Sequence, residues 1–369
     1  MKIKFKNPLP GIIRWIKQHY IMLLICLGIT GIVGGSLYLL HSDINKRTEG
    51  KGVEINIPEV VIHHLADSYD WHFATWNDTH LTIHLPVIIR SNATGEWHIC
   101  TTQTLPEGFY LDENHHDKVY EKMPDGTSER PLDLSITKLV AQLMLTVILL
   151  LVLFLSCARW YKKRDETSAA PRGIVGVMEM LVMYIHDDVI RPNVGEHQYK
   201  KYAGFLLTLF FFIFTTNLLG LIPGAANVTG NINVTLFLAL CTMLAINLFG
   251  NKLYWKDIFN PHVPWWLKFP IPLMPAIELF GIISKPFALM IRLFANMMAG
   301  HAVMLSFTCV IFFGTTLGVI GGEAMNLFSI VMLLFMYALE VLVAFVQAYV
   351  FTLLSSVFIG LAHVEEHAE

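Results

Sequence analysis

Charged side chains are scarce in this sequence. Asp, Glu, Lys and Arg together make up only 15% of its 369 residues, while 54% are hydrophobic and the mean hydropathy is +0.53. Soluble domains contain about 25% charged residues, so the composition excludes an ordinary soluble domain and predicts a polytopic membrane protein. The net charge of -3 provides no basic surface for nucleic acid.

Cysteine is also scarce, and its placement excludes two further classes of protein. Four of the five cysteines lie in apolar segments and Cys100 is alone in a polar region, with no C-x-x-C pair for a disulfide framework or a metal site. The sequence also contains no glycine-rich phosphate loop and no evident catalytic nucleophile. We therefore predict a protein that is not itself an enzyme and has no cofactor or metal.

Arginine is almost absent from the second half of the chain, where Arg292 is the only one after Arg191. A guanidinium stays charged at any cellular pH, and placing one at mid-bilayer depth costs about 2.5–3.5 kcal/mol on insertion scales. Such a residue usually faces a water-filled cavity or a partner and marks an ion path. The alternative is an arginine whose long side chain reaches the headgroups.

The N-terminal third divides into two parts. Residues 1–40 combine a basic start with an apolar run over 20–40 that is about long enough to span a bilayer, which is typical of a retained anchor or a signal segment. Residues 41–135 are polar, hold nine of the sixteen histidines and alternate with period two from Thr79. We predict an extracytoplasmic insert with some β character, whose histidines match no known ligand spacing.

The remaining residues, 136–369, form a predicted all-α membrane core. Basic residues follow the first apolar span, and the turns at 224–231 and 314–322 lack Lys and Arg, which places the C-terminus in the cytoplasm by the positive-inside rule. The amphipathic stretch 173–191 is expected to lie along the interface. The expected spans are 139–158, 203–223, 232–250, 275–313 and 324–362.

The last two spans are too long to cross a bilayer upright. Each has about 39 residues, or roughly 58 Å of helix, against a hydrocarbon core of about 30 Å. We therefore expect both helices to be bent or steeply tilted.

Polar residues recur at helical spacing in these two long segments. Glu278, Lys285 and Arg292 are seven apart and share one helix face, and small residues beside them would let another helix approach closely. Asn296 lies one turn beyond Arg292. In the last segment, one stripe contains Glu340, Ala344, Gln347, Phe351 and Ser355, so Glu340 is expected to face His301 across two helices as a titratable pair.

These motifs resemble subunit a of the rotary F-type ATP synthase over residues 136–369. The resemblance rests on RLFANMMAGH at 292–301, QAYVFTLL at 347–354, NLLGLIP at 217–223, SKP at 284–286 and Glu278. It implies that Arg292 is the family's obligatory arginine. Asn296 and Gln347 would then be the family's amide and glutamine positions, and His301 and Glu340 would be the family's interacting pair. It also implies the subunit-a fold, with two long tilted C-terminal helices.

The resemblance further implies a stator with two offset half-channels that carry protons to and from the c-ring carboxylates. Glu340, His301 and Gln347 would line the outer half-channel, and Glu278 the cytoplasmic one. The implied partners are the c-ring, subunit b of the peripheral stalk, the rest of the complex and lipid. The implied location is a bacterial plasma (inner) membrane.

Two other classes of membrane protein would share some of these features. An ion-coupled secondary transporter would also hold midplane charges, but it would show an inverted repeat with paired broken helices, which this sequence lacks. A membrane metalloenzyme would need ligand-spaced histidines in its helices, where His301 stands alone. A Na⁺-translocating version of the motor stays open, because the ring site decides the ion.

Overall fold

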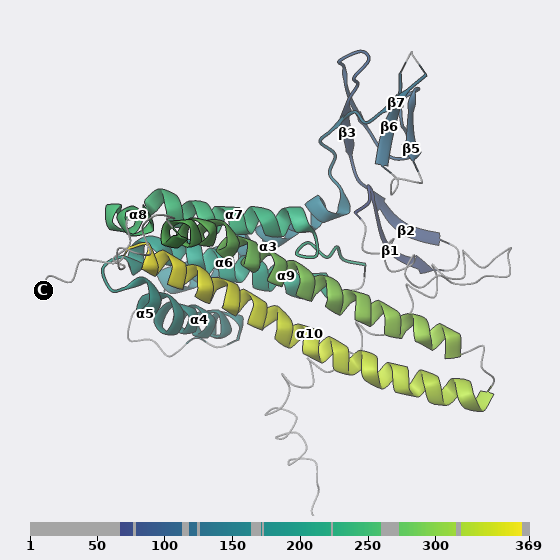
Figure 1. Cartoon of the computed structure of the whole chain (residues 1–369). Coiled ribbons are helices and arrows are strands. Elements are labelled where there is room, and N and C mark those ends of the chain that lie inside the picture. Colours follow the sequence, from purple (N-terminus) through teal and green to yellow (C-terminus); the bar gives the residue numbers. More distant parts are fainter. Residues whose placement is uncertain are drawn as a thin grey trace, which may run out of the picture.

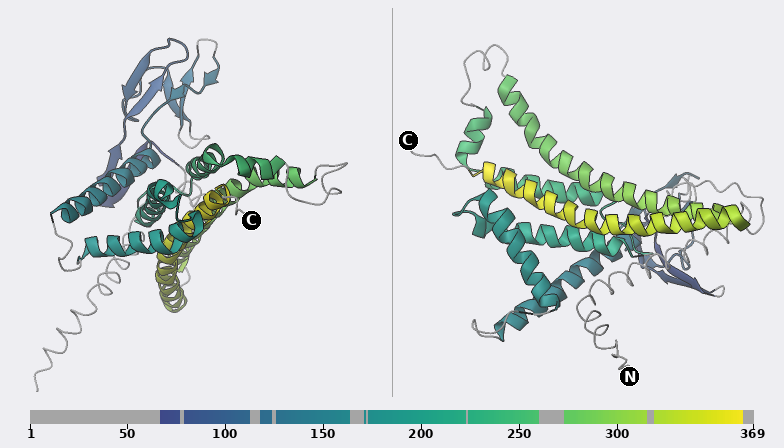
Figure 2. Two further views of the ribbon diagram at one scale, coloured as in Figure 1. Left: turned by 90° about the vertical axis from the view of Figure 1, so that its left-hand side faces the viewer. Right: turned by 90° about the horizontal axis from the view of Figure 1, so that it is seen from below.

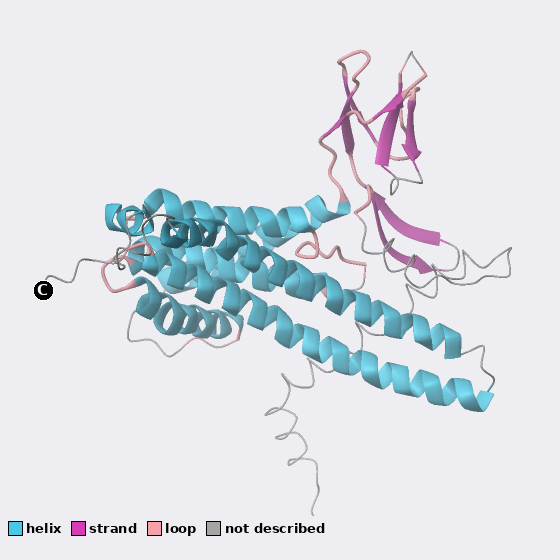
Figure 3. Ribbon diagram, viewed as in Figure 1, coloured by secondary structure: helices cyan, strands magenta, loops and turns pink. Residues whose placement is uncertain are grey.

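The computed structural model describes residues 67–76, 79–112, 118–123, 126–163, 171, 173–222, 224–259, 273–314 and 319–363. The predicted anchor or signal segment at 20–40 lies outside these residues, and so do five of the histidines of the insert. In the described part, helices form an elongated bundle and the strands gather at one end of it (Figures 1 and 3). The predicted fold class, an all-α membrane protein with a small insert of β character, is confirmed.

The insert consists of short antiparallel strands. β1 (Asp70–Trp76) pairs with β2 (Thr79–His84). The strand pattern expected from Thr79 onwards is interrupted after His84, next to Pro86, which has no N–H to donate to a ladder. A second sheet has β3 (Val87–Arg90) between β4 (Trp97–Cys100) and β8 (Leu132–Asp133). A third contains β5 (Phe109–Asp112), β6 (Lys118–Lys122) and β7 (Ser128–Glu129).

Hydrogen bonds from side chains and backbone attach the insert to the helices, among them the bond from the N–H of Lys138 to the carbonyl of Ser68 at 2.9 Å. The Oδ1 atom of Asp67 accepts the backbone N–H of Leu139 at 3.2 Å in the first turn of α3, where N–H groups have no helical partner. The indole of Trp71 donates to the carbonyl of Gly224 at 2.7 Å, in the link between α6 and α7. The insert is therefore held over the bundle end where α3 begins and α6 ends.

Within the described residues, five helices are long and apolar enough to cross a membrane. They are α3 (Lys138–Lys162), α6 (Tyr199–Gly220), α7 (Ile232–Phe249), α9 (Leu273–Gly314) and α10 (Val319–Leu361). α9 has 42 residues and α10 has 43, so each is about 64 Å long at 1.5 Å per residue. α9 begins apart from α10 and converges on it towards the end that carries the strands (Figure 2).

The helix core is centred on α6. Leu206, Phe210 and Ile213 of α6 are fully buried, together with Leu293 of α9 and Phe351 of α10. α3 is different, because most of its apolar side chains stay exposed, as expected for a helix at the edge of a bundle in lipid.

The expected interfacial helix at 173–191 is broken into three pieces: α4 (Ile174–Tyr184), η2 (Ile185–Ile190) and α5 (Arg191–Val194). η2 is a π-helical turn in which the N–H of Arg191 reaches back five residues to the carbonyl of His186. Pro192 follows and has no N–H to continue the α-helical ladder. α5 and α8 (Lys252–Phe259) lie at the end of the bundle opposite the strands (Figure 1).

Candidate functional site

Arg292 lies on an open face of α9. Its side chain and that of Asn296 are exposed, as are the neighbouring alanines, whereas Leu293 and Met297 on the adjacent face are buried. Among the described residues, Arg292 has no hydrogen bond or ion pair. The guanidinium therefore points away from the chain's own core, on a face with small neighbours: Ala288, Ala295 and Ala299.

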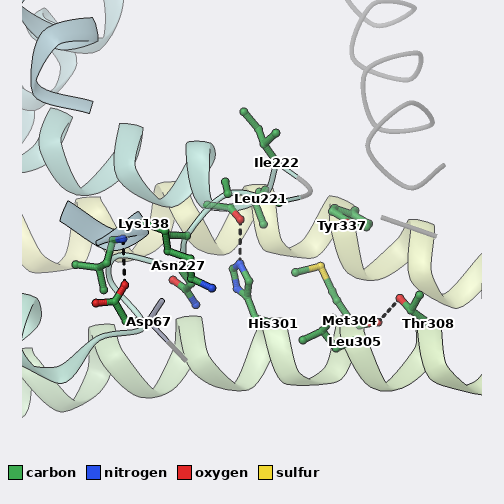
Figure 4. Close-up of a pocket in the computed structure, with 15 residues that line it drawn as sticks. Asp67, Lys138, Leu221, Ile222, Asn227, His301, Met304, Leu305, Thr308 and Tyr337 are labelled. Carbon is green, nitrogen blue, oxygen red and sulfur yellow. Dashed lines mark hydrogen bonds between the residues drawn. The ribbon is translucent and has the colours of Figure 1, made fainter. Parts of the chain in front are cut away.

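His301 is turned towards α6. Its Nδ1 atom lies 3.0 Å from the carbonyl of Met297, and its Nε2 atom lies 3.1 Å from the carbonyl of Gly220 (Figure 4). Both neighbours are acceptors, and a neutral imidazole can donate to only one of them, whereas an imidazolium can donate to both. An imidazolium would therefore satisfy both carbonyls, whereas a neutral ring would leave one of them facing an unprotonated nitrogen.

Glu340 is buried in the interface between α9 and α10, with 4% of its surface exposed. Its carboxylate rests against the backbone of Gly300, where any Cβ atom would overlap it. The Oε2 atom has no hydrogen-bond partner among the described residues. Gln347 and the rest of the predicted α10 stripe are buried as well: Ala344, Phe351 and Ser355.

His301 and Glu340, which were expected to face each other as a titratable pair, form no hydrogen bond or ion pair in the described part of the chain. They lie on facing helices and meet through Gly300, the residue before His301, but the imidazole bonds backbone carbonyls instead. Their role as a titratable pair stays a prediction.

A cavity of about 70 Å³ extends from His301 towards the insert (Figure 4). A buried water needs about 10–15 Å³ of such space, so several can fit. Asn227 lies in its wall and donates to the carbonyl of Met297 at 3.3 Å, the same carbonyl that His301 contacts. The sequence pattern does not single out Asn227, whose only signal is a polar side chain in a turn between two apolar spans.

Glu278 lies near the opposite end of the bundle, close to Tyr254. The Tyr254 hydroxyl donates to the side chain of Asn247 at 3.2 Å, and burial, followed by the charge of Glu278, raises the pKa of Tyr254. Lys285 is directed at α10, with its Nζ atom 5.5 Å from the centre of the Phe358 ring. Glu278, Lys285 and Arg292, which were predicted to share one helix face, therefore have different neighbours. Glu278 is close to Tyr254, Lys285 faces α10, and Arg292 lies on the open face of α9.

No three His, Cys, Asp or Glu side chains of the described ranges are grouped so that they could hold a metal ion. His41, His63, His64, His115 and His116 lie outside those ranges.

Two family models match the chain. The model described as ATP synthase A chain covers residues 142–360, which include the whole polar arrangement on α9 and α10. A model described as Domain of unknown function (DUF8433) covers residues 60–134, which correspond to the insert.

Curated relatives agree with the first model. "ATP synthase subunit a 2" of Chlorobaculum tepidum is 44% identical over 243 residues, 64% of this chain and 66% of the relative. "ATP synthase subunit a" of Myxococcus xanthus is 39% identical over 255 residues, 67% of this chain and 78% of the relative. "ATP synthase subunit a 2" of Chlorobium luteolum is 37% identical over 317 residues, 84% of this chain and 77% of the relative.

Proposed function

This chain belongs to the ATP synthase A chain family, and we propose that it is the stator subunit a of a rotary F-type ATP synthase that conducts protons through two offset half-channels. It is a multi-pass membrane protein of the membrane sector rather than the catalytic subunit. The observation that carries the proposal is Arg292 exposed on an alanine-lined face of α9, between two separate polar regions.

The open face of α9 suits the rotor. Small side chains let a second helix approach closely, and a partner carrying a carboxylate would meet the guanidinium there. The fixed positive charge favours the ionised carboxylate, so each ring site gives up its proton before it passes Arg292. This is how the residue would block a direct leak and couple ion flow to rotation, with Asn296 one turn away on the same face.

The two polar regions would serve as the half-channels. His301 is about 13 Å along the helix from Arg292, and Glu278 is about 21 Å away in the other direction. The outer path would run from the cavity past His301 to Glu340 and Gln347. The inner path would use Glu278, near Tyr254 and Asn247.

The partners we propose are those of subunit a. The c-ring would cover the open face of α9, subunit b would bind elsewhere on the chain, and the ATP chemistry would belong to other subunits of the complex. We place the chain in a bacterial inner membrane, with the 41–135 insert outside, the 136–369 core in lipid and the C-terminus in the cytoplasm. Protons are the default cargo, and each contributes about 2.3 kcal/mol per 100 mV, so several are needed for each ATP.

A purification experiment tests the assignment. An affinity tag at the C-terminus should recover an ATP-hydrolysing complex and a ring of small subunits from native membranes in mild detergent. Reconstituted vesicles should then acidify when ATP is added. Recovery of the chain without a ring or ATP hydrolysis would overturn the proposal.

Replacing Glu340 with Gln tests the outer path. The side chain keeps its shape, so the packing against Gly300 should persist, but it can no longer bind and release a proton. We expect passive proton flow through membranes stripped of the catalytic sector to fall at least about tenfold, because a positioned proton-transfer group commonly contributes about 10²–10⁴ where proton transfer limits the rate.

Glu196→Gln is the matched control. Glu196 is an exposed acid that bonds Arg191 at 2.8 Å outside the long helices, so wild-type flow is expected. Wild-type flow in Glu340→Gln would remove Glu340 from the path.

A further inference from the structure

The cavity that reaches His301 is not enclosed by the membrane helices alone. Its outer wall includes Asp67 and Lys138, which lie where the insert meets α3, and the link from Gly224 to Asn227 forms another side. Figure 4 shows Asp67 and Lys138 at one end of the cavity and His301 further in. The insert and the proton path therefore share one continuous space.

Asp67 is held in place at this entrance. Its Oδ1 atom accepts the N–H of Leu139 at 3.2 Å, and its Oδ2 atom is 3.9 Å from the Nζ atom of Lys118 on β6. The side chain is 23% exposed, so it contacts outside water as well as the cavity. No other carboxylate lines the cavity in the described part of the chain.

The insert also fixes the opposite wall. The Trp71 indole donates to the carbonyl of Gly224 at 2.7 Å, and Asn227, three residues later, bonds the carbonyl of Met297 beside His301. Movement of the insert would therefore reshape the cavity at the residues closest to the imidazole.

We propose that the N-terminal insert forms the outer mouth of the half-channel and that Asp67 is its entrance residue, exchanging protons between outside water and the cavity. The Asp67 carboxylate takes a proton from a hydronium ion in the outside water, which becomes water, and then releases it to a water molecule in the cavity. The hydronium ion formed there passes the proton to the unprotonated nitrogen of His301 and becomes water again. Only O–H and N–H bonds are made and broken. This inference rests on the proposed function and assigns a role to the domain of unknown function at 60–134.

Two substitutions separate this role from simple helix capping. Asp67→Asn keeps the oxygen that accepts the Leu139 N–H but cannot carry a proton, whereas Asp67→Glu keeps the carboxylate and lengthens the side chain. We expect Asn to lower passive proton flow three- to tenfold at an unchanged amount of assembled complex, and Glu to retain most of the flow. A capping role predicts the opposite order, and that order, or wild-type flow in both variants, would overturn the proposal.

Glu129→Gln is the matched control, because Glu129 is an exposed acid of the insert on β7 that does not line the cavity. Wild-type flow is expected in this variant. The entrance proposal is overturned if it slows flow as much as Asp67→Asn does.

Labelling tests whether the cavity opens to the outside. In a complex without native cysteines, Leu305→Cys lines the cavity, whereas Ser306→Cys is exposed on another face of α9. An impermeant cationic methanethiosulfonate added from outside should modify position 305 faster, and equal rates would contradict an entrance there. If Arg292→Ala stops pumping while both Asp67 variants behave like wild type, the entrance proposal fails and the proposed function stands.

Discussion

Replacing Arg292 with alanine is expected to abolish ATP-driven proton pumping in membrane vesicles. Two unit charges 4 Å apart attract by about 4 kcal/mol at an effective dielectric constant of 20, which corresponds to about a thousandfold change in an equilibrium at 1.36 kcal/mol per factor of ten. Without the guanidinium, ring carboxylates would lose that preference for their ionised form. We expect the initial pumping rate, measured by quenching of a pH-sensitive dye, to fall at least about a hundredfold.

Arg191→Ala is the control for loss of an arginine as such. Arg191 is an exposed residue of α5 that bonds Glu196, and surface ion pairs contribute about 0–1 kcal/mol, so normal pumping is expected. Arg292→Lys keeps the charge and loses the planar fork of donors, and we expect it to pump more slowly than wild type. Pumping by Arg292→Ala at a rate near that of wild type would refute the rotor-facing role.

The α10 stripe was predictable from the sequence because one helix face repeats at a fixed spacing. Glu340 and Gln347 are two turns apart and both are buried in the structure. The sequence singles out Arg292 for a different reason, since a permanent charge in an apolar run is costly, and the structure leaves its side chain exposed on α9. Its role stays a prediction. Both predictions depend only on local spacing and residue chemistry.

The neighbours of these residues were not predictable in the same way. The Nε2 atom of His301 meets the carbonyl of Gly220, 81 positions earlier in the chain, and periodicity specifies a face of a helix but not what packs on it. The same holds for Asp67, which lies before the first described strand and reaches the cavity only because the insert folds back over α3. The π-helical turn at 185–190 depends on a shift of one residue in hydrogen bonding, which an amphipathic pattern does not resolve.

Adding a single methyl group at Gly300 is expected to have the second largest effect on proton flow. Gly300 is buried in the middle of α9, and a Cβ atom there would overlap the Glu340 carboxylate. In an exposed helix, replacing Gly with Ala stabilises by about 0.8–1.0 kcal/mol, whereas overpacking a core commonly costs about 1–3 kcal/mol. Here the overlapping group is also the proposed proton carrier, so we expect Gly300→Ala to lower passive proton flow at least about tenfold, a barrier increase of about 1.4 kcal/mol.

Gly281→Ala is a matched control on the same helix, because its added Cβ would lie 3.7 Å from the Cε atom of Lys285, an ordinary van der Waals contact. We expect this variant to assemble and conduct like wild type. Shortening the carboxylate in the double variant Gly300→Ala with Glu340→Asp removes one methylene where the overlap occurs, so part of the lost flow should return. Because the two sites touch, their effects should be non-additive. Equal flow in Gly300→Ala and Gly281→Ala would instead mean that the Glu340 carboxylate is not held between α9 and α10, and the proposed outer half-channel would then lose its buried acid.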